Sequence, residues 1–187
     1  MNNPFVNDEF NSNDGMLTSV WGPSMWHTLH TISFNYPVKP SKNEQKDYLK
    51  FFMSLDKILP CRYCRENYKK NIKTVPLNSG SMQSRHTLSL WLYNLHEEIN
   101  RMLGKKSNLS YEDIRIRYEM FRSRCLFDKK SKKSQKSFKN KNKKGKVKEK
   151  GCVKPLYGKK SKCVINIVPN TKKCKTFNID KQCVLSS

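Results

Sequence analysis

The lysines of this chain are concentrated in one stretch, and that stretch limits where a core can form. Residues 129–150 hold twelve lysines and one glutamate, with serine and asparagine between them. Residues 122–187 carry 22 Lys and Arg against 3 Asp and Glu, a net charge of +19, whereas residues 1–121 carry 16 against 12, a net of +4. So charged a segment cannot bury enough apolar surface to fold. We expect a packed core before about residue 121 and a largely disordered tail over 125–187.

Helical periodicity dominates the first 121 residues. The strongest pattern covers 84–103, where Gly104 follows as a C-terminal cap and the apolar residues fall about 3.6 positions apart: Leu88, Trp91, Leu92, Leu95, Ile99 and Met102. Pro23 suits the first turn of an earlier helix that Tyr36-Pro37 ends, and Ser110 is a candidate N-cap of a short fifth helix. The second and third helices are predicted over residues 44–59 and 61–72. With no convincing strand, the sequence predicts an all-α fold, a small bundle of four helices plus a short fifth, after an Asn-rich mobile arm over 1–20.

Two cysteines at C-x-x-C spacing, Cys61 and Cys64, follow Pro60. If Cys61 opens a helix, Cys64 lies one turn further on the same face, so the two sulfurs can bond. A helix N-terminus favours thiolate over thiol, and Arg62 and Arg65 add positive charge nearby. This pattern indicates a redox dithiol first and half of a zinc site second. A closed zinc site needs further ligands, and no second close pair occurs in residues 1–121.

Histidines lie on two of the predicted helices. His30 stands one turn after Trp26, and His96 stands one turn before Asn100. His96 and Asn100 can meet a ligand lying across the helix end. Alternatively, His30 is a core histidine with its hydrogen bonds satisfied, and His96 and Asn100 form a solvent-facing edge.

Targeting signals are not evident. No run of about 18 apolar residues predicts a membrane span, and the polar, acidic N-terminus resembles neither a secretory signal nor an Arg-rich transit peptide. We therefore expect an intracellular protein that is not secreted. The seven cysteines are an odd number, so one must be free, paired between chains or used in exchange chemistry.

Three motifs in order resemble the Erv/ALR family of FAD-linked sulfhydryl oxidases. They are Trp26-His27-Thr28-Leu29-His30 with Tyr36-Pro37, then Pro60-Cys61-Arg62-Tyr63-Cys64, then Trp91-Leu92 through His96 and Asn100 to Leu103-Gly104-Lys105. The resemblance covers a little over half the chain and implies an oxidase domain over 21–124. It implies a helical bundle that holds FAD beside the C-x-x-C, commonly as a homodimer. The residues that it assigns to FAD contact are Trp26, His30, Tyr36, His96, Asn100, Lys105 and Tyr118.

The chain departs from the family pattern at three positions. Glu97 stands where many cellular members have Asn directly after the histidine, so the resemblance does not carry over that one polar contact. Tyr93 and Ser110 stand where, or near where, many members have a disulfide-bonded cysteine pair. We interpret the absence of both cysteines as the loss of a structural disulfide. Viral members look similar in this respect, which favours a viral origin and a place in host cytoplasm or virion.

The resemblance implies oxidation of protein dithiols to disulfides, with O2 reduced to H2O2. Cys61 would meet incoming thiols and Cys64 would lie next to the isoalloxazine ring. Family members often relay electrons through a mobile cysteine pair, and here the candidates are Cys125, Cys152, Cys163, Cys174 and Cys183. The alternative functions are a zinc module built on the C-x-x-C and a nucleic-acid-binding protein whose lysine tail contacts phosphates without sequence preference.

Overall fold

The computed structural model describes residues 8, 11–124, 151–175 and 177–183. Within these ranges the chain forms five α-helices: α1 (Thr18–Asn35), α2 (Lys42–Ile58), α3 (Arg62–Thr74), α4 (Arg85–Met102) and α5 (Tyr111–Glu119). The strands of the described part are two residues long each, β1 (Ser123–Arg124) and β2 (Lys154–Pro155), and a 3-10 helix η2 covers Lys181–Cys183. The predicted all-α class is confirmed. In the same ranges, no helix is both long and apolar enough to cross a membrane.

The chain divides into two compact units, Met1–Tyr118 with Ile165–Phe177, and Glu119–Val164 with Asn178–Ser187. In the second unit β1 pairs antiparallel with β2, and the Lys159 backbone N–H donates to the Gln182 carbonyl at 2.9 Å. The lysine tract over 129–150 lies outside the described residues, so its disorder stays a prediction, as do the domain bounds.

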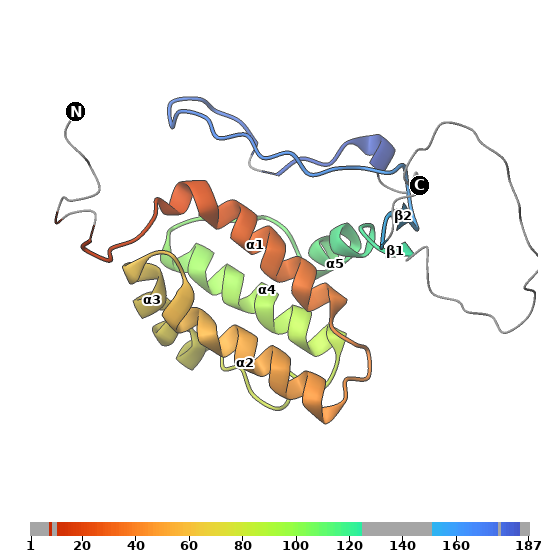
Figure 1. The fold of residues 1–187 in the computed structure, drawn as a ribbon, viewed down its shortest axis with the longest axis horizontal. Helices are drawn as coiled ribbons and strands as arrows, with labels where there is room; N and C mark the ends of the chain where they lie inside the picture. The colour runs from red at the N-terminus through yellow and green to blue at the C-terminus, as the bar shows by residue number, and fades with distance from the viewer. Residues whose placement is uncertain (1–7, 9–10, 125–150, 176, 184–187) are drawn as a thin grey trace, which may run out of the picture. The chain divides into compact units, whose positions relative to one another are not determined.

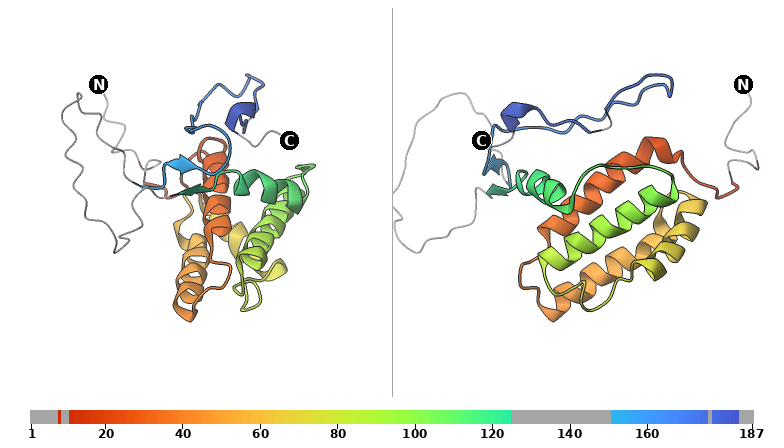
Figure 2. Two further views of the ribbon diagram at one scale, coloured as in Figure 1. Left: turned by 90° about the vertical axis from the view of Figure 1, so that its right-hand side faces the viewer. Right: turned by 180° about the vertical axis from the view of Figure 1, so that it is seen from behind.

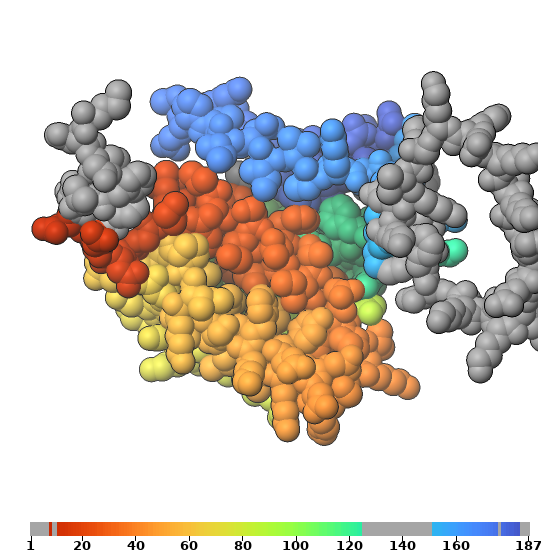
Figure 3. Space-filling view, viewed as in Figure 1, coloured from red at the N-terminus to blue at the C-terminus, as the bar shows by residue number. Residues whose placement is uncertain are grey.

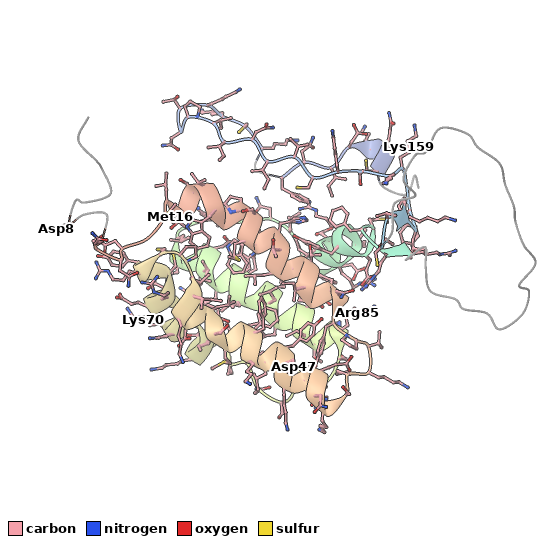
Figure 4. All side chains as sticks on the ribbon, viewed as in Figure 1. Asp8, Met16, Asp47, Lys70, Arg85 and Lys159 are labelled. Atoms are coloured by element: carbon pink, nitrogen blue, oxygen red, sulfur yellow. A yellow bond between two sulfur atoms is a disulfide. The ribbon has the colours of Figure 1, made fainter. Side chains whose placement is uncertain are left out.

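The first unit is a helical bundle in which α1 and α4 run antiparallel, with α2 and α3 packed beside them (Figures 1 and 2). Arg85, at the start of α4, donates from Nε to the carbonyl of Tyr36, just past the end of α1, at 2.7 Å (Figure 4). Burial of large apolar side chains stabilises the bundle by about 1.5–3 kcal/mol each. The buried core consists of Leu29, Tyr36, Phe52, Leu55, Leu59, Tyr68, Met82, Leu88, Trp91, Leu92 and Leu95.

Helix ends follow the capping residues of the sequence. Ser41 and Ser84 form capping boxes at α2 and α4, and Ser110 pairs reciprocally with Asp113 at the start of α5. Gly104 has φ +66° just past α4, as expected of a C-terminal glycine. By contrast, α1 begins five residues before Pro23. Its first turn is fixed by other bonds, since the backbone N–H of Val20 donates to the Leu17 carbonyl.

Candidate active site

Cys61 and Cys64 form a disulfide at the N-terminal end of α3. Cys61 is the N-cap residue, and its sulfur accepts a hydrogen bond from the Cys64 backbone N–H at 3.2 Å. Both residues are half-buried. Among the described residues no group of three His, Cys, Asp or Glu side chains could hold a metal ion, so the zinc alternative gains no support. The two sulfurs instead form a dithiol–disulfide pair at the positive end of a helix dipole.

The neighbouring arginines are occupied by other partners. Arg62 Nε lies 2.8 Å from Asp14 Oδ1, and this carboxylate raises the pKa of the Arg62 guanidinium. Arg65 donates to the carbonyls of Leu59 at 2.8 Å and Asn13 at 3.2 Å. The positive charge of Arg62 is therefore offset by Asp14, and less of it reaches the sulfurs than the sequence analysis assumed.

These bonds fix a segment that we call the N-terminal strap, residues 13–17, against the start of α3 (Figure 3). Gly15 forms an antiparallel bridge with Cys61, in which the Met16 N–H donates to the Pro60 carbonyl at 2.6 Å. Gly15 has φ +109°, and a Cβ there would lie 2.5 Å from the Pro60 oxygen, so only glycine fits. Just after the strap, Thr18 Oγ1 lies 3.6 Å from Cys64 Sγ. No sequence pattern predicts this contact, because the apolar residues of the arm do not repeat at a regular spacing.

Four of the predicted cofactor residues form an aromatic cluster, Trp26, His30, His96 and Tyr118, drawn from α1, α4 and α5. The Trp26 and His96 rings stack with centroids 3.8 Å apart at 5°. His30 Nε2 lies 3.1 Å from His96 Nδ1, and the Tyr118 ring lies 5.3 Å from that of His30. Trp26 and Cys64 both pack against the hydrophobic core, which links the cluster to the disulfide.

Burial keeps both cluster histidines neutral. It lowers the pKa of His30 to about 3, with a further contribution from His96, and lowers the pKa of His96 to about 4. His30 Nδ1 is buried with no hydrogen-bond partner among the described residues. A buried polar atom without a partner is costly, so this nitrogen is a natural contact for a polar group of a ligand.

The remaining predicted residues, Tyr36, Asn100 and Lys105, have other contacts. Asn100 donates from Nδ2 to Glu97 Oε1 at 3.0 Å, so Glu97 occupies its side-chain amide. Lys105 is exposed just past α4, where it lines an open hollow of about 470 Å³ with Arg101 and Lys106. Tyr36 is fully buried, and its hydroxyl donates to the Met82 carbonyl at 2.8 Å. Tyr36 therefore offers no exposed face.

Two further residues adjoin the cluster. His27 Nδ1 lies 3.3 Å from the Tyr118 hydroxyl, and the Phe177 ring lies 5.2 Å from the His27 ring. The Arg117 guanidinium lies over the Phe177 ring at 5.2 Å. His27 lies within the first family motif but had no predicted role. No sequence pattern predicted the contacts of Phe177, because this residue lies far beyond the part of the chain that shows helical periodicity.

A hydrogen bond stands near the place of the missing family disulfide. The Tyr93 hydroxyl donates to the Leu109 carbonyl at 2.8 Å, and its ring meets Tyr111 edge-on at 5.8 Å. The middle of α4 is thus joined to the start of α5 by non-covalent contacts.

A small helical bundle that carries a helix-capping C-x-x-C disulfide is typical of dithiol–disulfide redox proteins. The Erv1 / Alr family model matches residues 23–119, just over half of the chain. This chain belongs to the Erv1 / Alr family.

Known relatives and solved structures match the same region. A probable FAD-linked sulfhydryl oxidase of Acanthamoeba polyphaga mimivirus is 34% identical over 91 residues, 49% of this chain and 64% of the relative. The FAD-linked sulfhydryl oxidase ERV1 of Arabidopsis thaliana is 34% identical over 84 residues, 45% of this chain and 42% of the relative. The crystal structure of the FAD-binding domain of Erv1 from Saccharomyces cerevisiae matches with a TM-score of 0.50 and 25% identity, covering 56% of this chain and 95% of that one. The match thus spans less than two thirds of each of these two relatives' own length.

Proposed function

We propose that this chain is an FAD-dependent thiol oxidase that forms disulfide bonds in protein substrates. The observation that carries the proposal is the Cys61–Cys64 disulfide at the head of α3, in a fold shared with proteins named FAD-linked sulfhydryl oxidases. A disulfide at a helix N-terminus is a suitable oxidant for an incoming dithiol, because the leaving thiolate is stabilised there.

The residues of the site fit FAD. Trp26 and His96 provide flat aromatic surface, and His30 Nδ1 provides the buried polar atom without a partner in the described chain. Lys105 and Lys106 around the hollow past α4 provide positive charge for the pyrophosphate, whereas Arg101 there is ion-paired with Glu98. When bound, FAD supplies a two-electron acceptor that returns to its oxidised form by reducing O2 to H2O2. Tyr36, being buried, would act by holding the end of α1 against the core.

The chain's own residues carry the thiol exchange. A substrate thiolate attacks Cys61 Sγ, a substrate–Cys61 disulfide forms, and the bond to Cys64 breaks with its electron pair left on Cys64 Sγ. A second substrate thiolate then attacks the mixed disulfide, which releases the oxidised substrate and leaves Cys61 reduced. The net reaction of two thiols with O2 gives one disulfide and H2O2.

Replacing Cys64 tests this function. We expect Cys64→Ser to abolish dithiol-dependent O2 consumption while the purified protein stays yellow, since serine removes the disulfide but leaves the aromatic cluster intact. Cys174→Ser, which changes an exposed free cysteine, is the matched control and should retain activity towards a small dithiol. A flavin-loaded Cys64→Ser protein that oxidised dithiols at the original rate would exclude the mechanism, and a colourless wild-type protein would exclude the cofactor.

Partners and place complete the proposal. Protein dithiols are the substrates, and the active form is a homodimer inside the cell, in host cytoplasm or virion if the chain is viral. Similarity to proteins of mimivirus and of invertebrate iridescent viruses supports a viral origin. Contact of the lysine tract with nucleic acid involves residues outside the described part of the chain and stays an accessory prediction.

A further inference from the structure

We infer that Thr18 donates a hydrogen bond to the sulfur of Cys64 and stabilises the thiolate that forms there when the disulfide is reduced. Thr18 Oγ1 lies 3.6 Å from Cys64 Sγ, within the usual reach of a hydrogen bond to sulfur. In the disulfide Cys64 carries no proton, so the hydroxyl must be the donor. This inference rests on the proposed function, because the thiolate matters only if the disulfide turns over.

The position of Thr18 reinforces the effect. Cys64 lies in the first turn of α3, and Thr18 is the first residue of α1, whose N-cap residue Leu17 makes no side-chain capping bond. The contact therefore places Cys64 Sγ close to the positive ends of two helix dipoles. Both helix dipoles favour negative charge on Cys64 Sγ, and the Thr18 hydroxyl adds a hydrogen bond to the same sulfur.

The strap holds Thr18 in place. The Arg62 N–H donates to the Asp14 carbonyl at 2.8 Å, and the Met16 N–H donates to the Pro60 carbonyl at 2.6 Å. Asp14 and Met16 are the two neighbours of Gly15 in the chain. With the Arg62–Asp14 ion pair, these bonds tie the chain on either side of Gly15 to the loop that carries Cys61. The donor and its acceptor are thus built on segments that are bonded to one another.

The chemical step that benefits is the first exchange. A substrate thiolate bonds to Cys61 Sγ as the Cys61–Cys64 bond breaks, and the electron pair of that bond goes to Cys64 Sγ. Thr18 lowers the energy of this product by donating to the sulfur that gains the charge. It thereby favours Cys64 as the leaving thiolate, in competition with the Cys64 backbone N–H that donates to Cys61 Sγ at 3.2 Å.

Alkylation of the reduced protein tests this role without using oxidase activity. The full-length protein is reduced anaerobically with excess phosphine, treated briefly with iodoacetamide over a range of pH, and digested with trypsin. Cleavage after Lys57, Arg62 and Arg65 puts Cys61 and Cys64 on separate peptides for mass spectrometry. Near neutral pH we expect Thr18→Val to slow alkylation of Cys64 by about three- to tenfold and to move its pH profile upward, because less thiolate forms.

Two variants guard the interpretation. Thr18→Ser keeps the hydroxyl and should restore the wild-type profile. Thr31→Val removes a hydroxyl from the same helix that donates only to the His27 carbonyl among the described residues, and it should change nothing. An unchanged Cys64 profile in Thr18→Val, or a Thr18→Ser profile like that of valine, would overturn the inference. Wild-type oxidase activity is measured separately, so loss of the proposed function would be seen on its own.

Discussion

At the scale of single residues, the two cysteines of the C-x-x-C have different surroundings although only three positions separate them. The Cys61 sulfur accepts the Cys64 N–H as the cap of α3, and the Cys64 sulfur faces the Thr18 hydroxyl. The asymmetry supports the roles that the family resemblance implies, with Cys61 attacked and Cys64 released.

The two neutral histidines predict a pH dependence of stability. Burial holds the pKa of His30 at about 3 and that of His96 at about 4, whereas an unfolded histidine titrates near 6.5. Below pH 6.5 the unfolded state therefore binds more protons than the folded one, and stability is lost as pH falls towards about 4. We expect the free energy of unfolding, from denaturant titrations, to be highest above pH 6.5 and to decline through this window.

A variant isolates the contribution of His96. His96→Phe keeps a ring to stack on Trp26 but cannot titrate, so the decline between pH 6.5 and about 4 should become shallower by the contribution of about one proton. His86→Gln changes an exposed histidine and is the control. An equal slope in wild type and His96→Phe would mean that His96 is not kept neutral by burial.

At the scale of elements, periodicity predicted all five helices and Ser110 as the cap of α5, but not the caps Ser41 and Ser84, the start of α1 five residues before Pro23, or the strap. The α2, α4 and α5 starts follow from Ser41, Ser84 and Ser110, since each cap is a local bond between near neighbours. The Gly15–Cys61 bridge joins segments 46 residues apart and depends on a backbone conformation, φ +109°, that no periodic pattern encodes. Likewise the sequence named Trp26, His30 and His96, but their stacking needs the α1–α4 packing.

The strap can be tested through Gly15. A Cβ in Gly15→Ala would meet the Pro60 oxygen at 2.5 Å, so the strap must shift away from Cys61. We expect Cys64 alkylation in the reduced protein to slow as in Thr18→Val, and the strap to become more sensitive to proteases. Gly151→Ala, at φ +113° with nothing within 4 Å, imposes similar backbone strain without a clash and should leave both readouts unchanged. Wild-type behaviour of Gly15→Ala would show that the strap does not position Thr18.

At the scale of the whole molecule, the charge pattern predicts a boundary between a foldable part and a tail, and that boundary stays a prediction, since Ile165–Phe177 of the tail groups with the first compact unit. The bundle was predictable because its apolar residues repeat every turn, but the Phe177 contact with His27 was not, because it joins residues 150 positions apart. The tail cysteines also differ in state: Cys152 is disulfide-bonded, whereas Cys163, Cys174 and Cys183 are free. Cys125 lies outside the described residues.

Truncation after residue 124 tests whether the tail relays electrons. If a tail cysteine pair carries them to Cys61, oxidation of a protein dithiol should slow by about tenfold or more, because a tethered relay is replaced by direct encounter. Oxidation of a small dithiol should be little affected. The full-length protein with Cys163, Cys174 and Cys183 all changed to Ser separates loss of thiols from loss of Phe177. Equal rates on the protein substrate before and after truncation would remove the relay.

The place of the strap along the chain has a consequence for how this protein can evolve. Residues 13–18 precede the family match, which begins at residue 23, and the strap is bonded to the start of α3 and, through the Met16 carbonyl, to the indole N–H of Trp21. Substitutions there can alter the surroundings of Cys64 at little cost to the packing of the helices. A lineage could therefore adjust the oxidising strength of its disulfide by drift in an appended segment, while the shared bundle stayed unchanged.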